Sequence, residues 1–333
     1  MITPEKLSQK RAQLLERTST ALKLQPATAA ALFASKRLSS FRINKLKVDD
    51  ELSLLAELAT DGWSGVQSTF YEHGYGIVTG RTEIVNSAAA KDGRIFIQNQ
   101  ASWLPILALN PQPGDKILDI CAAPGGKGSM IAELTNNQSE LWVNDNSRAR
   151  LFKLRSNFTR LGARYNEQTM YGIDRLPHVL PNASFDKILL DAPCSGEGLL
   201  DIARDKDFEY WSLSQIKRLE RLQKKGMTAA WKLLKPGGTL VYSTCTMAPE
   251  ENESVVDYLL SRNSDAQLQP FDVSLLNKFP AVNQWNGHLY KNDLSNCLRL
   301  VPSLLVEAFF VAKIVKRNDS HTNQSDDFYY KSQ

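Results

Sequence analysis

Cysteine, histidine and long apolar runs are all scarce in this 333-residue chain, which has four cysteines and four histidines. None of the cysteines belongs to a C-x-x-C pair, so the spacing disfavours a zinc site and we expect no metal. No apolar stretch approaches the roughly 20 residues that a membrane helix needs, and the start has no apolar secretory core. We therefore expect no membrane association and a cytoplasmic protein, whose thiols stay reduced.

Acidic residues are scarce at the beginning of the chain, although the net charge of the whole chain is only +4. Up to residue 47, only Glu5 and Glu16 oppose a series of basic side chains. A basic lobe of this kind suits the phosphate backbone of a nucleic acid, whose attraction is long-ranged. A solvated helix face explains the same charges equally well. The basic residues are Lys6, Lys10, Arg11, Arg17, Lys23, Lys36, Arg37, Arg42, Lys45 and Lys47.

The first 92 residues predict a small, basic, RNA-binding α/β lobe. Leucines at helical spacing indicate a helix over residues 4–35, and alternating apolar residues indicate a strand over 41–48. A capped helix over 49–59 and short glycine-rich strands over 62–80 are expected to follow.

From about residue 93 the pattern changes to a regular alternation of strands and helices. Such βα units imply an α/β fold with a doubly wound, mostly parallel sheet and helices on both faces. This domain is expected to cover 93–316, and the polar tail over 317–333 to be disordered. The expected strands are 116–120, 140–145, 185–193 and 239–244, with helices over 126–134, 149–162, 213–234 and 251–262 and an antiparallel pair, 298–301 and 307–315.

The first of these strands runs into a loop of small residues, DICAAPGGK, at 119–127. Its glycines allow a ligand to approach the backbone, and the N-terminus of the next helix favours an anionic group. Asp145 would accept hydrogen bonds from ribose hydroxyls, and Asp174 from an adenine amino group. A proline before the glycines argues against a dinucleotide. S-adenosylmethionine therefore fits better than NAD, whereas Asp119 as a strand-end cap is compatible with either.

Two of the four cysteines follow apolar strands, in LDAPCSG at 190–196 and in LVYSTCT at 240–246. Carboxyl ends of parallel strands share one edge of the sheet, so Cys194 and Cys245 are expected beside the cofactor. Inert packing is the competing interpretation, because free cysteine packs well in cores. We apply that interpretation to Cys121 and Cys297.

Methylation at carbon 5 of a pyrimidine is a reaction that needs a thiol. This carbon has no lone pair, but addition of a thiolate to carbon 6 makes it nucleophilic. Charge that develops toward ring N3 and O2 needs an acid or a cation, for which Asp191 and Lys127 are the local candidates. Loss of the carbon 5 proton and elimination of the thiol then need a second acid–base group. Chemistry alone does not rank the two cysteines.

Three ordered motifs resemble the Nop/Sun (RsmB-like) family of RNA cytosine-C5 methyltransferases: DICAAPGGK at 119–127, DAPCSGEG at 191–198 and YSTCTMAPEENE at 242–253. Weaker flanking similarities occur at 42–48, 93–105 and 299–316. The resemblance implies a class I Rossmann-like methyltransferase fold.

The resemblance also implies roles for individual residues. Cys245 would be the nucleophile at carbon 6, Cys194 would assist release of the methylated base, and Asp191 would also contact the cytosine. The residues implied to contact S-adenosylmethionine are Cys121, Ala122, Ala123, Pro124, Gly125, Gly126, Lys127, Asp145, Asp174 and Asp191.

The sequence departs from the family pattern at several positions, and these departures concern the substrate-side details that the resemblance implies. Gly128 and Leu199 stand where threonine is usual, and Ala308 where glycine is usual. The histidine that usually follows the proline of LVP is missing. None of these changes removes a catalytic group.

The leading hypothesis is an RNA (cytosine-5) methyltransferase that acts on ribosomal RNA as a monomer, with transfer RNA as the close alternative. Bases could stack on Trp63, Phe70, Tyr71 or Tyr75, although these aromatic residues suit a core equally well. An N- or O-methyltransferase and a non-catalytic RNA-binding assembly factor are the other readings. Further RNA contacts are expected from basic residues of one helix: Arg148, Arg150, Lys153, Arg155 and Arg160.

Overall fold

A computed structural model describes residues 3–34, 37–271, 273 and 277–318 of the chain. The tail predicted after residue 316 lies outside the described residues from 319 onward.

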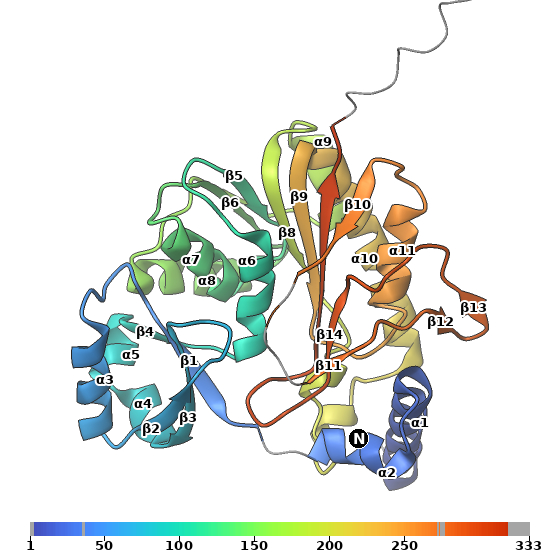
Figure 1. Cartoon of the computed structure of the whole chain (residues 1–333), viewed down its shortest axis with the longest axis horizontal. Coiled ribbons are helices and arrows are strands. Elements are labelled where there is room, and N and C mark those ends of the chain that lie inside the picture. The colour runs from blue at the N-terminus through green and yellow to red at the C-terminus, as the bar shows by residue number, and fades with distance from the viewer. Residues whose placement is uncertain (1–2, 35–36, 272, 274–276, 319–333) are drawn as a thin grey trace, which may run out of the picture.

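The largest sheet has nine strands, and the five neighbouring strands that reach one of its edges run parallel (Figure 1). The path order is β11-β14-β15-β9-β8-β5-β6-β7, and β10 pairs with β15. This order confirms the predicted doubly wound sheet. The parallel strands are β5 (Lys116–Asp119), β6 (Glu140–Asn144), β7 (Glu167–Thr169), β8 (Phe185–Asp191) and β9 (Leu234–Thr244).

Antiparallel strands complete this sheet beside β9. The pairing of β14 (Leu298–Leu300) with β15 (Phe309–Lys316) confirms the predicted C-terminal hairpin. Antiparallel pairs also join β15 to β9, β10 (Ala266–Gln269) to β15, and β11 (Lys278–Phe279) to β14. A separate hairpin pairs β12 (Gln284–Trp285) with β13 (His288–Leu289).

Helices cover both faces of the sheet because successive strand residues point to opposite sides. Ile117 belongs to the core under one set of helices, and Leu118 to the core under the other. The first set is α6 (Leu104–Leu109), α7 (Gly126–Leu134) and α8 (Arg148–Leu161). The second set is α9 (Leu176–Val179), α10 (Leu213–Leu233) and α11 (Glu253–Leu260). Single 3₁₀ turns lie at η1 (Gln100–Trp103), η2 (Ile173–Arg175), η3 (Glu197–Leu199) and η4 (Asp205–Phe208).

The helix predicted over 4–35 is two helices, α1 (Pro4–Leu22) and α2 (Pro26–Ala34). Lys23 adopts a left-handed conformation with φ of 53°, and its N–H donates to the carbonyl of Ser19. Proline lacks an N–H and is favoured in the first turn of a helix, so Pro26 begins a new helix instead of continuing the first.

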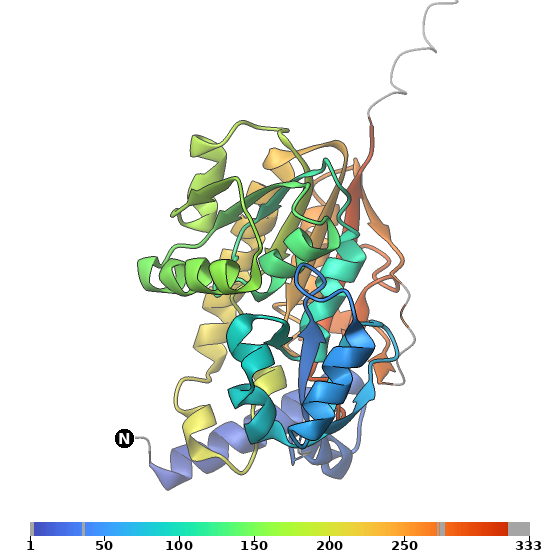
Figure 2. The same cartoon turned by 90° about the vertical axis from the view of Figure 1, so that its left-hand side faces the viewer.

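A second sheet of four strands, in the order β2-β3-β1-β4, forms a separate lobe (Figure 2). The strand predicted over 41–48 ends at Ile43, because the backbone turns where the Lys47 N–H donates to the Asn44 carbonyl. The strands are β1 (Ser39–Ile43), β2 (Ser64–Gln67), β3 (Gly74–Thr79) and β4 (Ile95–Ile97), packed with helices α3 (Glu51–Thr60), α4 (Arg81–Asn86) and α5 (Ala88–Asp92).

The N-terminal residues thus form two pieces, and β4 extends the lobe beyond the expected boundary at residue 92. Leu14 of α1 and Phe33 of α2 pack with Phe208, Trp211 and Met247, away from the lobe. Figure 1 shows both pieces at the lower end of the large sheet, toward which β9 runs. Ligands of doubly wound sheets bind at this carboxyl end of the strands.

Candidate active site

The two cysteine loops lie side by side because β8 and β9 are neighbouring parallel strands in register. Asp191 stands opposite Ser243, and the Ala192 N–H donates to the Ser243 carbonyl. The Sγ atoms of Cys194 and Cys245 are 3.1 Å apart as free thiols. The Cys245 N–H donates to Cys194 Sγ at 3.3 Å. The structure therefore brings together the two thiols expected at this edge.

Lys127 and Asp191 form an ion pair beside the thiols. Lys127 Nζ lies 2.7 Å from Asp191 Oδ2, and the Ser243 hydroxyl donates to Asp191 Oδ1 at 2.8 Å. Burial lowers the pKa of Lys127, but Asp191, with smaller contributions from Cys245 and Asp119, leaves that pKa above its usual value. The lysine is therefore a cation fixed at the start of α7.

The environment of Cys194 favours its thiol form. The hydrogen bond with Cys245 raises the pKa of Cys194 well above its usual value, and burial raises it further. Cys194 is therefore suited to hold or give a proton in this pair.

A buried carboxylate, Glu251, holds the Cys194 loop from behind. It accepts the Ser195 N–H at 3.0 Å and the Gln223 amide at 2.8 Å, while the same amide also donates to the Pro193 carbonyl. Burial raises the pKa of Glu251 to about 7. Sequence reasoning missed this residue, although it lies in the PEEN stretch of the third motif.

A second buried carboxylate, Glu197, holds the Cys245 loop. It accepts the Trp211 indole N–H at 3.0 Å and the Thr246 hydroxyl at 3.2 Å. The Thr246 hydroxyl also lies 2.7 Å from the Ser195 hydroxyl, which joins the two loops. Burial raises the pKa of Glu197. The positions of both thiols therefore depend on one continuous network of buried polar groups.

The 121–127 loop follows β5 at the point where the strand order reverses. Its Ala122 N–H donates to the Asn144 carbonyl at 2.8 Å. Gly125 has φ of 104° and an added Cβ would lie 3.1 Å from Phe158, so glycine is required there. Arg150 and Asn157 of α8 donate to the carbonyls of Ala123 and Pro124. The loop backbone is therefore fixed from two sides.

Asp119 is a buried carboxyl group whose oxygens have no hydrogen-bond partner of good geometry among the described residues. Asp119 is only 1% exposed, and burial raises the pKa of its carboxyl group to about 7. A ligand amine would satisfy these oxygens, because an unpartnered buried polar group is costly. The amino group of the methionine part of S-adenosylmethionine supplies such a donor. Asp119, which the sequence suggested only as a cap, thus fits the predicted cofactor.

The two other predicted cofactor acids differ in their surroundings. Asp145 is buried, accepts the Ser147 N–H at 3.0 Å and lies 2.9 Å from Arg150 Nη1. Asp174 is exposed on η2, beyond the end of β7. Both lie past the carboxyl ends of parallel strands, on the side of the 121–127 loop.

Residues 106–315 match the family described as 16S rRNA methyltransferase RsmB/F. The chain belongs to the RsmB/F methyltransferase family. This membership confirms the Nop/Sun resemblance and the methyl donor S-adenosylmethionine. A methyltransferase homologue from Pyrococcus horikoshii superposes with a TM-score of 0.80 at 30% identity, covering 95% of this chain and 100% of that one.

Curated relatives include enzymes for two kinds of RNA. The tRNA (cytosine(49)-C(5))-methyltransferase of Pyrococcus abyssi is 39% identical over 228 residues, or 67% of this chain and 71% of the relative. Ribosomal RNA small subunit methyltransferase F of Klebsiella pneumoniae is 36% identical over 287 residues, or 83% of this chain. The chain spans 57% of the length of that second relative.

In this RsmB/F family member several basic residues predicted to face RNA have internal partners instead. Arg42 is fully buried against Glu133, and Arg160 donates to the Ala90 carbonyl. Arg150 forms an ion pair with Asp145 and donates to the Ala123 carbonyl. Internal contacts also hold Lys10, Arg11 and Arg17. Arg148, Lys153 and Arg155 of α8 are exposed, as RNA contacts require.

The aromatic residues considered for base stacking belong mainly to cores. Tyr71 is 6% exposed and Tyr75 is 7% exposed. Trp63 packs edge-on against Phe41 and Tyr75 within the lobe. Phe70 packs partly buried beside Trp103. Core packing therefore accounts for these four side chains.

The described residues also bear on two other classes of site, metal centres and membrane spans. They contain no group of three or more His, Cys, Asp or Glu side chains arranged to hold a metal ion. Within the same ranges, every helix is too short or too polar to cross a bilayer.

Proposed function

We propose that the chain is an S-adenosylmethionine-dependent RNA (cytosine-5) methyltransferase that acts through a covalent cysteine adduct. The observation that carries this proposal is the pair of thiols 3.1 Å apart beside the Lys127–Asp191 ion pair. Transfer to nitrogen or oxygen needs only a base and positioning, whereas transfer to carbon 5 of cytosine needs a thiol.

In the proposed reaction Cys245 Sγ, as a thiolate, adds to carbon 6 of the cytosine. The electron pair of the carbon 5–carbon 6 double bond moves toward ring N3 and O2, where the Lys127 cation stabilises it. Asp191, held by Lys127 and Ser243, accepts a hydrogen bond from the exocyclic amine. S-adenosylmethionine, when bound, supplies an electrophilic methyl group for carbon 5.

Release then requires loss of the carbon 5 proton to a base. The electrons of that C–H bond restore the double bond, and the carbon 6–sulfur bond breaks with its electron pair returning to Cys245. We assign release to Cys194, whose raised pKa keeps a proton available for the departing sulfur 3.1 Å away. The cofactor would be held by residues 121–127 together with Asp119, Asp145 and Asp174.

The two cysteines can be told apart by trapping the adduct. Cys194→Ala should accumulate a covalent RNA–protein complex that survives denaturing electrophoresis, because addition proceeds and release is blocked. Cys245→Ala should form none, and it should lose methylation. Adducts that require Cys194 and persist without Cys245 would reverse the assignment. Full methylation by Cys245→Ala would instead support an N- or O-methyltransferase.

We propose ribosomal RNA as the substrate, because relatives named for it match 83% of this chain. Transfer RNA is the second candidate, because the relative named for it is matched over 71% of its own length. Bisulfite sequencing of total RNA from a deletion strain distinguishes the two by the cytosine that loses its methyl group. Unchanged methylation in that strain would favour a non-catalytic assembly factor.

We further propose that the enzyme acts in the cytoplasm as a monomer. RNA substrates and two reduced thiols suit the cytoplasm. One chain supplies both thiols and the Lys127–Asp191 ion pair. Sedimentation of the protein with and without RNA would test the monomer.

A further inference from the structure

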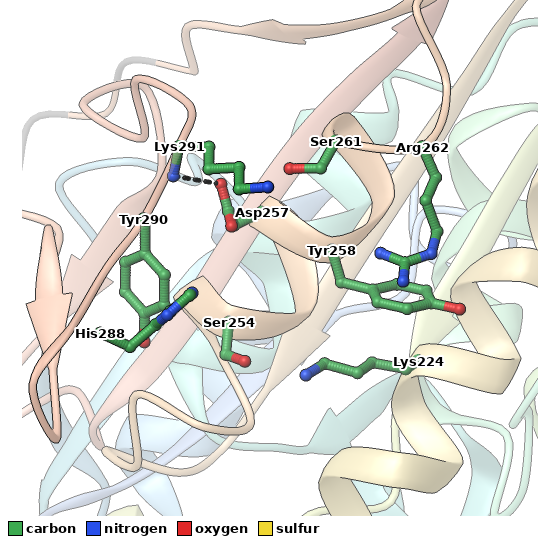
Figure 3. Close-up of a pocket in the computed structure, with 9 residues that line it drawn as sticks. All are labelled: Lys224, Ser254, Asp257, Tyr258, Ser261, Arg262, His288, Tyr290 and Lys291. Carbon is green, nitrogen blue, oxygen red and sulfur yellow. Dashed lines mark hydrogen bonds between the residues drawn. The ribbon is translucent and has the colours of Figure 1, made fainter.

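A surface cavity of about 280 Å³ lies between α10, α11 and the β12–β13 hairpin (Figure 3). Its walls carry Lys224 from α10, Arg262 just after α11, and His288 and Lys291 from the hairpin region. Tyr258 lies at the centre of the α11 wall, with the Arg262 guanidinium 4.0 Å from its ring centroid. Basic side chains from three segments of the chain therefore line one cavity.

Much of this positive charge has no internal partner. Among the described residues no carboxylate pairs with Arg262 or Lys291, and both are exposed. Lys224 lies 2.6 Å from Glu220. The cavity's own carboxylate, Asp257, uses its Oδ1 to accept N–H groups of Lys291 and Asn292. Asp257 is thus the one carboxylate in the walls, and Arg262 and Lys291 are cations without a carboxylate partner among the described residues. The charge of the third cation, Lys224, is balanced by Glu220.

The cavity is separate from the catalytic edge. Gln223 points to the Cys194 loop, where it contacts the Pro193 carbonyl and Glu251. Lys224 is the next residue of the same helix and lines the cavity instead. Adjacent positions on a helix point in different directions. The cavity lining therefore shares no residue with the two cysteine loops.

We propose that this cavity binds a phosphate group of the RNA substrate outside the catalytic edge. The proposal rests on the proposed function for RNA as substrate. A cavity of about 280 Å³ is larger than a phosphate group. The Arg262 guanidinium lies over the Tyr258 ring, and a guanidinium in the cavity wall can bind phosphate through its N–H groups. The exposed Lys291 on the opposite wall provides a second contact.

The test is RNA binding by the full chain, measured as fluorescence anisotropy of a labelled 16S rRNA transcript. The double variant Arg262→Glu/Lys291→Glu should bind this RNA about tenfold more weakly than wild type at moderate salt. The slope of log affinity against log salt should become shallower by about 1, because the slope scales with the number of neutralised phosphates and the cavity binds one. Binding of S-adenosylmethionine should not change.

A matched control reverses two exposed charges at the other end of the sheet. Arg164 and Lys232 precede β7 and β9, at the amino ends of the strands. Arg164→Glu/Lys232→Glu changes net charge equally and should leave the salt slope within about 0.5 of wild type. Equal losses in the two double variants would mean that only overall charge matters, and would overturn the proposal.

Inorganic phosphate distinguishes the two sources of the anion. Phosphate at millimolar concentration should compete weakly with RNA for the wild-type protein. Tight phosphate binding that the double variant loses, together with unchanged RNA affinity, would assign the cavity to a free anion and refute RNA binding. These measurements do not require methylation, so failure of the catalytic proposal would be seen separately, as absence of an adduct with Cys194→Ala.

Discussion

At the scale of single residues, Asp119 is the site carboxylate whose oxygens most clearly need a hydrogen-bond donor from a ligand. Asp145 and Asp191 have charged partners, whereas the oxygens of Asp119 lack a well-formed hydrogen bond within the described ranges. Burial raises its pKa to about 7, with the neighbouring Asp191 carboxylate adding to the rise. A cationic amine beside Asp119 would donate the missing hydrogen bonds and would lower the pKa of its carboxyl group.

Asp119→Asn should weaken binding of S-adenosylmethionine about 10- to 100-fold, because a buried charge-assisted hydrogen bond is worth about 1.5–3 kcal/mol. Wild-type affinity should rise with pH toward 8 as Asp119 ionises, and the affinity of the variant should not follow this rise. Calorimetric titration at several pH values measures both effects. Asp115→Asn, which removes the salt bridge with Lys187, is the control and should bind normally. Equal affinity of wild type and Asp119→Asn would contradict this role.

The same carboxyl group affects stability in the absence of cofactor. Its folded pKa of about 7 lies above the value of 3.8 for an unperturbed aspartate, so the folded state holds the proton more tightly. This stabilisation is complete below about pH 4 and is lost as pH rises through about 7. Relative to Asp119→Asn, wild type should lose up to about 4 kcal/mol between pH 4 and 8, at about 1.4 kcal/mol per pKa unit. Urea unfolding of both proteins at several pH values measures this difference, whose opposite sign would contradict a raised pKa.

At the scale of elements, a buried ion pair joins the lobe to helix α7, which follows the cofactor loop. Arg42 of β1 contacts Glu133 of α7 and donates to the Ser129 hydroxyl at 2.9 Å. The Tyr71 hydroxyl donates to Glu133 at 3.0 Å. Burial lowers the pKa of Arg42 to about 10, so the guanidinium stays charged at neutral pH. Strand β1 and helix α7 are therefore held by charges that water does not reach.

Arg42→Met should lower the free energy of unfolding by about 3–5 kcal/mol, because it leaves Glu133 buried and uncompensated. The double variant Arg42→Met/Glu133→Leu should regain most of that loss. The control is Arg94→Met, which breaks a partly exposed pair with Glu57 in the same lobe and should cost about 1 kcal/mol or less. Urea unfolding measures all three. A double variant no more stable than Arg42→Met would show that the two charges act independently.

Elements of the large sheet were predictable because buried parallel strands are continuous apolar runs between glycine-rich turns. The single helix over 4–35 was wrong because leucine spacing does not report the left-handed turn at Lys23. At the site, the rule that parallel strands end on one edge was enough to place Cys194 and Cys245 together. Glu251 was not predictable, because its raised pKa comes from burial by segments distant in the sequence.

At the scale of the whole molecule, the N-terminal helices are connected to the catalytic loops. Arg17 of α1 lies 2.8 Å from Glu250, next to Glu251 in the sequence. Leu14 packs in the same core as Trp211, whose indole N–H donates to Glu197. By contrast, the 121–127 loop is fixed by Asn144 and α8 on the other side of the site. The molecule thus holds its thiols and its cofactor loop with different parts of the chain.

Leu14→Glu should therefore separate the two functions. A charge at a fully buried position on α1 should undock this helix and loosen the Glu197–Thr246 contact, so that adduct formation falls at least about tenfold (~1.4 kcal/mol in the barrier). Affinity for S-adenosylmethionine should stay within about twofold (~0.4 kcal/mol) of wild type, which also verifies that the domain is folded. Gln13→Glu adds the same charge to an exposed position of the same helix and should change neither property. Adduct yields are measured by denaturing electrophoresis in the Cys194→Ala background. If adduct formation and cofactor affinity fell equally, α1 would stabilise the whole domain rather than the thiol loops.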